Sequence, residues 1–119
     1  MVVIKIFGVK EAIRIIREKG IDAVEKVEKA IDQETNKLQT EVMRSISNGI
    51  NAARAFDTGF FMRGTMSETI GLTGRVYNEV EYGGYIEYGT SRMEARPHFR
   101  NTFFKLKPGI ITAIKKSVI

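Results

Sequence analysis

The stretch DAVEKVEKAIDQETNKLQTEVMRSISNGINAAR, residues 22–54, decides the fold. Its apolar residues recur every three or four positions with charged residues between them, which is the period of an amphipathic helix. We therefore predict one helix over 22–54, roughly 45–50 Å long at a rise of 1.5 Å per residue. A compact domain of this size is narrower than that. We expect part of the apolar stripe to lie against another subunit; its first members are Val24, Val27, Ile31 and Leu38.

Shorter elements are predicted on both sides of this helix. Residues 2–7, VVIKIF, are mostly β-branched and stop at Gly8, which predicts an edge strand. Residues 9–20, VKEAIRIIREKG, predict a short helix that ends at a glycine. After the long helix, RGTMSETI (63–70) and RVYNEV (75–80) predict two antiparallel strands joined by the turn GLTG.

The last third of the chain completes the predicted fold. Residues 81–90, EYGGYIEYGT, allow two interpretations, because the spacing of the apolar residues favours one helical turn whereas Gly83-Gly84 indicates a bend. Pro97 is placed to open a C-terminal helix, which Pro108 is able to kink or restart. We predict an α+β fold in a single domain, residues 1–119, with a long N-terminal amphipathic helix and a C-terminal helix packed on a small antiparallel β-sheet.

The composition excludes several classes of protein. The 119 residues are 43% apolar, which suits one core, and they include no cysteine and a single histidine, His98. We therefore expect no disulfide, no metal site and no cofactor. Residues 1–16 are apolar but carry four charged residues, too many for a signal segment or a membrane span. We expect a soluble intracellular protein that binds neither a membrane nor a small molecule.

The net charge of +5 is unevenly distributed along the chain. Residues 55–91 hold two basic against five acidic residues, whereas residues 92–119 hold seven basic residues against Glu94 alone. A basic block of this kind either meets phosphates or an acidic protein surface, or it is a solvated face. The lysines that we expect to face an acidic partner or DNA are Lys105, Lys107, Lys115 and Lys116.

Asp57-Thr58-Gly59 is the tripeptide that carries the catalytic carboxylate of aspartic proteases. Such a protease needs its aspartate in a tight loop after an apolar strand, so that two chains bring two carboxylates together to share one proton. Here the tripeptide follows a predicted helix and precedes the bulky Phe60. We favour a structural turn, in which Asp57 and Thr58 bond to nearby amides while Gly59 lets the chain leave the helix and enter the sheet.

The other polar and aromatic candidates also lack the neighbouring residues that catalysis or nucleic-acid binding would require. Glu79, Glu81 and Glu87 have no His, Cys or Lys near them in sequence to divide acid and base roles, so we favour a solvated sheet edge. The tyrosines between residues 77 and 88 could stack nucleic-acid bases, but the same acidic residues favour packing in the core or at a subunit interface. We expect that the protein is not an enzyme.

Two stretches, DTGFFMR at 57–63 and VYNEVEYGGYIEYGTSRMEARPHFR at 76–100, carry a resemblance. With the long helix before them and a helix behind them, they resemble the tail-component family of long-tailed bacteriophages and prophages, the tail-completion or head–tail joining proteins. Gly83 departs from the family's usual alanine and His98 from its usual phenylalanine, and Arg63 stands one place late. The matching residues are Asp57, Thr58, Gly59, Arg63, Asn78, Tyr82, Tyr85, Ile86, Glu87, Gly89, Thr90, Arg92, Met93, Ala95, Arg96, Pro97 and Phe99.

The resemblance implies a structural virion protein of the phage neck or tail, assembled in the host bacterial cytoplasm. It would join head to tail as part of a ring at the head-proximal end of the tail, with copies of itself and neighbouring neck and tail proteins as partners and DNA as a passing contact. We expect Glu87 to pair with Arg92 or Arg96, and Gly89 to adopt a backbone angle that other residues resist. The residues expected at the assembly interface are Tyr82, Tyr85, Glu87, Gly89, Thr90, Arg92, Arg96 and Pro97.

Two further classes of function stay open on the sequence. A small nucleic-acid-binding domain would use the basic C-terminal block, and its binding would weaken steeply with salt. A dimeric aspartic protease would act through Asp57-Thr58-Gly59, and one substitution at Asp57 would silence it.

Overall fold

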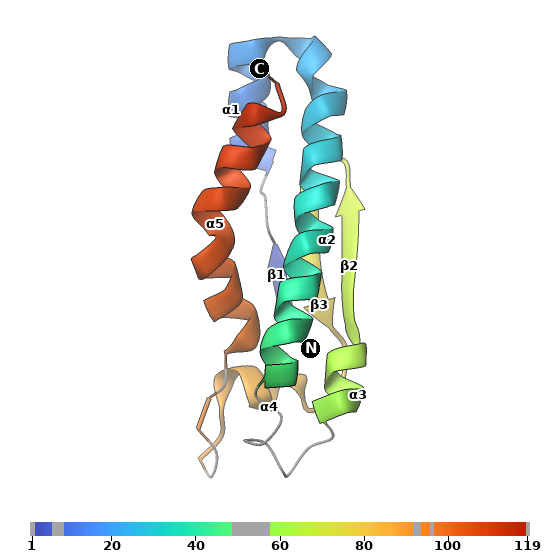
Figure 1. Ribbon diagram of the computed structural model, residues 1–119, viewed down its shortest axis with the longest axis vertical. Helices are drawn as coiled ribbons and strands as arrows, with labels where there is room; N and C mark the ends of the chain where they lie inside the picture. Colours follow the sequence, from blue (N-terminus) through green and yellow to red (C-terminus); the bar gives the residue numbers. More distant parts are fainter. Residues whose placement is uncertain (1, 6–8, 49–57, 92–93, 96, 119) are drawn as a thin grey trace.

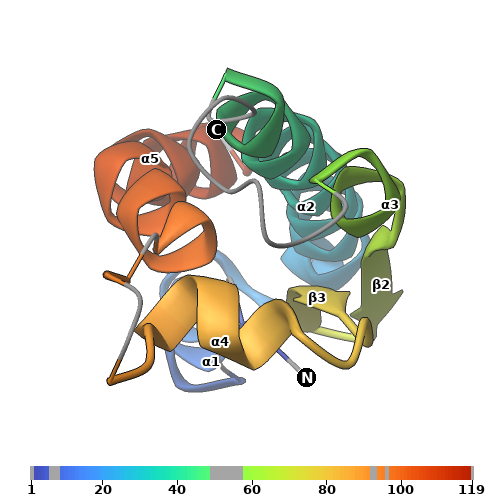
Figure 2. The same cartoon turned by 90° about the horizontal axis from the view of Figure 1, so that it is seen from below.

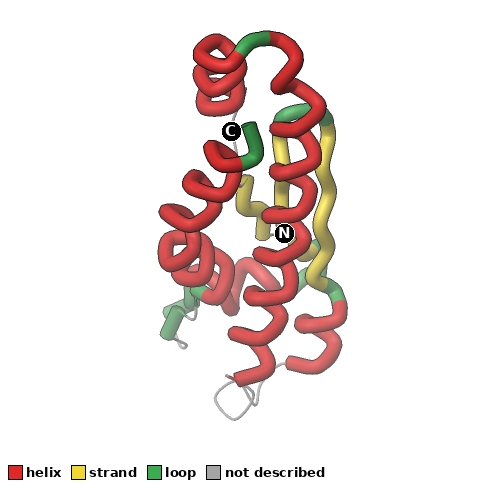
Figure 3. Tube along the Cα trace, turned by 45° about the horizontal axis from the view of Figure 1, so that its top comes forward, coloured by secondary structure: helices red, strands yellow, loops and turns green. Residues whose placement is uncertain are grey.

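The computed structural model describes residues 2–5, 9–48, 58–91, 94–95 and 97–118 (Figure 1). The molecule is elongated, with extents of 51 × 20 × 19 Å. Figure 3 shows the strands gathered on one side of the long helix, so the predicted α+β fold is confirmed. In chain order the elements are β1 (Val2–Lys5), α1 (Val9–Lys19), the 3₁₀ turn η1 (Ile21–Ala23), α2 (Val24–Asn48), α3 (Thr58–Arg63), β2 (Thr65–Ile70), β3 (Thr73–Asn78), α4 (Gly83–Tyr88) and α5 (His98–Lys116).

The three strands form one antiparallel sheet in the order β1-β3-β2, which places β1 at an edge as predicted. β2 and β3 are joined by a two-residue turn that starts at Gly71, whose φ of 56° suits a tight hairpin. This confirms the predicted hairpin. β3 begins at Thr73, two residues before the predicted strand, because so short a turn leaves Thr73 paired with Ile70.

α2 lies across β2 and β3, and α5 lies beside α2 and β1 (Figure 1). Helix and sheet approach closely at Gly74, where an added Cβ atom would stand 2.0 Å from Oγ1 of Thr35. The Thr35 hydroxyl is buried and donates to the carbonyl oxygen of Ile31 at 2.6 Å. Only a residue without a side chain therefore lets α2 rest directly on the backbone of β3.

The apolar stripe of α2 is buried within the single chain. Val27, Ile31 and Leu38 are fully buried, because the sheet and α5 both pack along the helix. The expectation that part of this stripe lies against another subunit is therefore wrong for these three residues. The molecule is elongated, 51 Å in its longest extent, so the sheet and α5 can run along the helix. Val24, the first member of the stripe, is half-buried. The buried apolar residues of the core are Ala23, Val27, Ala30, Ile31, Leu38, Val42, Ile46, Phe61, Val76, Ile86, Phe99, Ile110 and Ile114. The predicted end of the long helix, at residue 54, lies outside the described residues.

The chain does not pass from a turn straight into the sheet. Thr58 and Gly59 begin the six-residue helix α3, which corrects the predicted structural turn, and Asp57 lies outside the described residues. The helix forms here because it places Phe61 in the core, 1% exposed. The side chain of Asn78 then fastens α3 to the sheet. Its Nδ2 donates to the Phe61 carbonyl oxygen at 2.6 Å, and its Oδ1 accepts from the backbone N–H of Val80 at 2.9 Å.

The two regions that the sequence left ambiguous are both helical. Residues 83–88 form α4 despite the paired glycines, because Ile86 enters the core. α5 opens directly after Pro97 as predicted and continues through Pro108, which neither ends nor restarts it. None of the helices in the described part of the chain combines the length and the apolar character that a membrane span requires.

Candidate assembly surface

Several short segments meet at one end of the molecule. α3, α4 and the first turns of α5 lie there, beside the last turns of α2 (Figures 1 and 2). Three large side chains of this end are exposed, Phe60 by 52%, Tyr85 by 56% and Tyr88 by 58%. We call these three side chains the aromatic end. Exposed aromatic residues are typical of protein interfaces, because they bury much area while losing little side-chain freedom.

Glu87 fixes the base of this surface. Its side chain is 1% exposed, and its carboxylate accepts hydrogen bonds from the backbone N–H groups of Phe99 and Arg100, each at 3.0 Å. The same carboxylate accepts from Nε of Arg100 at 3.0 Å, while Nη2 of Arg100 donates to the Glu87 carbonyl oxygen at 2.8 Å. A buried charge is tolerated when it is paired and hydrogen-bonded in this way.

The amides that Glu87 binds lie in the first turn of α5, where N–H groups have no partner within the helix. Pro97, which precedes the helix, supplies no side-chain cap. Glu87 therefore caps α5 from α4, twelve residues earlier in the chain, and its negative charge also suits the positive end of the helix dipole. α4 and α5 are held in one relative position by this residue.

Gly89 ends α4 with an unusual backbone. Its φ of 78° and ψ of 176° lie in a region that is open essentially to glycine alone. Its N–H donates to the carbonyl oxygen of Tyr85 at 2.8 Å, which closes the last helical turn. The expected backbone angle at Gly89 is thus confirmed.

The aromatic end is continuous with the core. The guanidinium carbon of Arg100 lies 4.6 Å from the centroid of the Tyr88 ring, so the arginine that binds Glu87 also supports an exposed tyrosine. At the same end of the molecule, the centroid of the Phe61 ring lies 6.3 Å from the ring centroids of both Tyr82 and Phe99. Aromatic pairs at such distances interact favourably beyond the area that they bury.

The structure brings together most of the residues expected at the assembly interface. Tyr82, Tyr85, Glu87 and Gly89 belong to or border α4, and Pro97 stands at the start of α5. Thr90 is exposed just beyond them, whereas Arg92 and Arg96 lie outside the described residues.

The partner that the structure shows for Glu87 is Arg100, which the sequence prediction missed. The sequence held only an indirect signal: Pro97 cannot cap the helix that it opens, so the first N–H groups need another acceptor, but nothing in the sequence points to Glu87 as that acceptor. The interpretation of Glu87 as part of a solvated sheet edge is wrong, because it belongs to α4 and faces inward. Glu79 and Glu81, in the link between β3 and α4, are exposed.

The four lysines expected to face a partner all lie on α5 and are exposed. They are Lys105, Lys107, Lys115 and Lys116. Phe104, on the same helix, is 65% exposed, which is unusual for so large an apolar side chain. α5 therefore presents an aromatic residue among cations.

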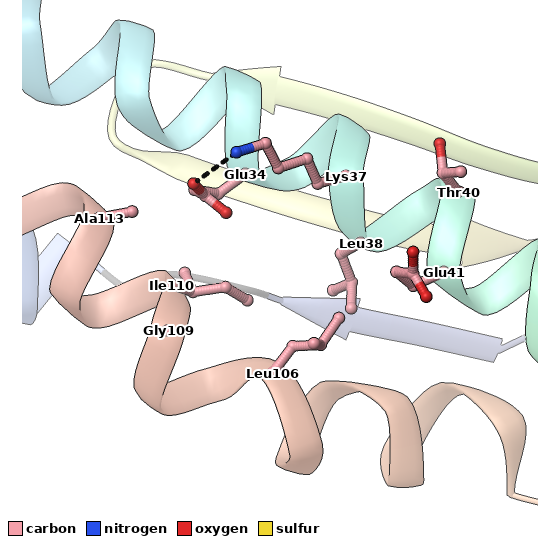
Figure 4. Close-up of a pocket in the computed structure, with 9 residues that line it drawn as sticks. All are labelled: Glu34, Lys37, Leu38, Thr40, Glu41, Leu106, Gly109, Ile110 and Ala113. Atoms are coloured by element: carbon pink, nitrogen blue, oxygen red, sulfur yellow. Dashed lines mark hydrogen bonds and ion pairs between the residues drawn. The ribbon is translucent and has the colours of Figure 1, made fainter.

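An open groove runs between α2 and α5 (Figure 4). Leu38, Leu106 and Ile110 line its floor, and the ion pair of Glu34 with Lys37, at 3.4 Å, lies on its rim. The described residues that line it include no histidine; its polar members are Glu34, Lys37, Thr40 and Glu41.

One further polar contact joins two helices. Oγ of Ser45 lies 2.9 Å from Nδ1 of His98, which links α2 to the start of α5. No three acidic or histidine side chains of the described residues lie close enough together to hold a metal ion.

Comparisons of the chain with protein-family models, with curated proteins and with solved structures found no match.

Proposed function

We propose that this chain is a structural assembly protein without catalytic activity. More specifically, we propose a virion protein of a long-tailed phage or prophage, which joins head to tail within a ring at the head-proximal end of the tail. The observation that carries the proposal is how the motif residues divide: Glu87 and Gly89 build a fixed support, and Tyr85 stands exposed upon it, beside the equally exposed Tyr88, which is not a motif residue.

A fixed support with exposed tyrosines suits a protein that binds to a head or tail that is already assembled. Ordering loops and side chains on binding costs free energy, and a support already fixed by Glu87 and Arg100 reduces that cost. Exposed tyrosines are among the side chains that contribute most to binding when an interface closes over them. The aromatic end is accordingly the surface offered to a neighbouring neck or tail protein.

Further copies of the chain complete the ring, and the lysines of α5 face an acidic neck protein or the path of the DNA. Assembly takes place in the host bacterial cytoplasm. The free chain is a monomer or a weak oligomer, because a ring that closed early would obstruct ordered assembly.

The proposal is tested by electron microscopy of lysates from a phage with an early stop codon in this gene. We expect free DNA-filled heads and free tails, because a joining protein is needed for neither packaging nor tail polymerisation. Joined, infectious particles in normal number would sink the assignment.

A sharper test replaces Tyr85 and Tyr88 together by serine. We expect a folded chain, since both side chains are largely exposed, but a strong loss of joined particles. The matched control is Ile13→Ser, which removes an apolar side chain of α1 that is 42% exposed and should leave joining unchanged. Equal effects of the two changes would show that the aromatic end has no special role.

A nucleic-acid-binding domain is the second candidate, favoured by the four exposed lysines of α5. It predicts that the purified chain binds duplex DNA and that the logarithm of affinity falls linearly with the logarithm of salt concentration. A steep slope that flattens when the four lysines are replaced by glutamine would favour this candidate over the joining protein.

A further inference from the structure

Another pocket lies between α2 and α5, at the same end of the molecule as the aromatic end. It is an open cavity of about 340 Å³ between the last turns of α2 and the first turns of α5, which run in opposite directions (Figure 1). It adjoins the groove of Figure 4, with which it shares Glu41 and Leu106. We call it the polar pocket, and its lining residues are Glu41, Arg44, Ser45, Asn101, Thr102, Lys105 and Leu106.

Helical spacing places these polar side chains together. On α2, Glu41, Arg44 and Ser45 stand at positions i, i+3 and i+4, which share one side of a helix. On α5, Lys105 stands four residues after Asn101, so these two also share a side. The polar pocket is therefore built by two helices that pack side by side along the core.

Several hydrogen-bond donors of the polar pocket have no acceptor within the described part of the chain. Lys105 forms no ion pair there, and the side chains of Asn101 and Thr102 form no hydrogen bond there. Arg44 binds the Glu41 carboxylate through Nη1, and its other N–H groups have no partner among the described residues. An ammonium, a guanidinium, a hydroxyl and a side-chain amide are therefore available to a ligand.

Ser45 adds a hydroxyl that is held in place by the opposite helix. Its Oγ lies 2.9 Å from Nδ1 of His98, at the start of α5. In the tautomer in which Nδ1 donates, Oγ is the acceptor, and the hydroxyl hydrogen of Ser45 can itself be donated to a ligand. The same contact fixes the two walls of the pocket relative to each other.

The lining residues are of the types that bind phosphate oxygens. Arginine, lysine, serine, threonine and asparagine side chains are among those that contact nucleic-acid phosphates. A phosphate group carries its oxygens in a tetrahedral arrangement, so it can accept from donors on two facing helices at once. The charge also suits an anion, since the two cations Arg44 and Lys105 outnumber the carboxylate of Glu41, and the chain carries a net charge of +5.

We propose that the polar pocket binds a phosphate group. Arg44 and Lys105 supply the charge, and the neutral donors come from Ser45, Asn101 and Thr102. The inference rests on the DNA contact of the proposed function, which it assigns to this pocket beside the aromatic end. The phosphate is then a backbone phosphodiester of DNA; a free phosphate ion carries the same chemistry, and the experiment separates the two sources.

Glu41 competes with the phosphate group. Its carboxylate binds the Arg44 guanidinium, and its charge repels an anion in the polar pocket. Glu41→Gln should therefore strengthen phosphate binding, whereas loss of a neighbouring cation should weaken it. Partial unfolding does not produce a gain from one lining residue and a loss from another.

The experiment measures binding of a short fluorescent DNA duplex to the purified chain at low salt, by fluorescence anisotropy. Lys105→Gln should weaken binding about tenfold, because it removes a charged donor from the polar pocket. The matched control is Lys107→Gln, which removes the same charge from the same helix outside the pocket and should weaken binding about twofold. Glu41→Gln should strengthen binding about threefold.

A second pair of variants leaves the charge unchanged. Thr102→Val removes a hydroxyl from the polar pocket and should weaken duplex binding about threefold. Thr112→Val changes a threonine of the same helix outside the pocket and should leave binding as it is. Circular dichroism of each variant shows that it is folded.

Titration with inorganic phosphate, followed by the backbone amide NMR signals of residues 101–105, separates the two sources of the phosphate. Saturable shifts that sodium chloride of equal ionic strength does not produce would show that the polar pocket also takes a free phosphate ion. Duplex binding that depends on Lys105 and Thr102, without such shifts, would assign the pocket to the DNA backbone.

Binding of neither the duplex nor inorganic phosphate would overturn the proposal. Equal losses from Lys105→Gln and Lys107→Gln would overturn it as well, because DNA would then meet the basic helix as a whole, and so would equal binding by Thr102→Val and Thr112→Val. A glutamate-rich peptide that binds in place of DNA would overturn the phosphate and favour the acidic neck protein. Failure of the proposed function is distinct, since it is decided by whether the stop-codon phage still produces joined particles.

Discussion

The contact of α2 with the sheet and the junction of α4 with α5 stabilise this protein in different ways. Along α2, many apolar side chains are buried in succession, and at Gly74 of β3 the described helix and sheet leave no room for a side chain. At the junction, one carboxylate, Glu87, binds two backbone amides and a guanidinium. The first contact is distributed over a repeated pattern, whereas the second depends on one side chain. They should therefore respond differently to substitution.

Gly74→Ala should produce the largest effect, because its Cβ would stand 2.0 Å from Oγ1 of Thr35. We expect a loss of about 3 kcal/mol in the free energy of unfolding, measured by urea denaturation. Thr35→Ala in the same chain should restore part of the loss, since it removes the clashing oxygen. The matched control is Gly84→Ala, where an added Cβ meets nothing within 4 Å and helix propensity gains about 0.5–1 kcal/mol. Additive effects of the Gly74 and Thr35 changes would contradict the close approach.

Glu87→Ala should come next, with a loss of about 2 kcal/mol. It leaves the amides of Phe99 and Arg100 without their acceptor, but the Arg100 side chain is 38% exposed and regains water. Glu87→Gln keeps one side-chain oxygen as acceptor and should lose about half as much. If alanine and glutamine destabilise equally, the capping of α5 by this side chain is not what stabilises the junction.

Gly89→Val should destabilise by about 1.5 kcal/mol, because a β-branched residue is strained at φ 78° and ψ 176°. We expect its effect on particle joining to be larger than its effect on folding of the free chain. Gly20→Val is the control, since Gly20, which links α1 to η1, has a φ of 92° with open space around it. Figure 1 shows α1 and the start of α2 at the opposite end of the molecule from α4. Normal joining by a folded Gly89→Val protein would remove this loop from the assembly surface.

The smallest effect is expected from Tyr88→Leu, which removes the ring that Arg100 covers at 4.6 Å. The loss should be about 0.5 kcal/mol. Tyr85→Leu, at a tyrosine of similar exposure, should cost less, because the described residues place no cation over the Tyr85 ring. A thermal melt of both proteins measures the difference. Equal melting temperatures would show that Arg100 supports Tyr88 only geometrically.

The features that could be predicted from the sequence are those that depend on residues close together in the chain. The long helix, the hairpin at Gly71 and the helix behind Pro97 were predictable, because each depends on a period or a turn residue within a few positions. The burial of the α2 stripe in one chain was not, because it depends on α5 and the sheet, which pack against the helix from far away in sequence. Helix α3 was missed for the same reason, since Phe61 pulls those residues into the core.

For the candidate surface, the sequence predicted which residues gather but not what each one does. Tyr85, Glu87 and Gly89 were expected together, and they border one helix. The burial of Glu87 could not be foreseen, because a glutamate among glycines and tyrosines is usually solvated. Its role became visible only when the uncapped start of α5 was placed beside it.

Because Glu87 caps α5, two amide protons can be used to measure how often the junction of α4 and α5 opens. The N–H groups of Phe99 and Arg100 are protected from exchange with water only while α4 is seated against α5. Their exchange rates therefore measure the opening of the junction, separately from unfolding of the core around α2. A partner that binds Tyr85 and Tyr88 should hold α4 against α5, and so slow hydrogen exchange at these two amides without contacting them.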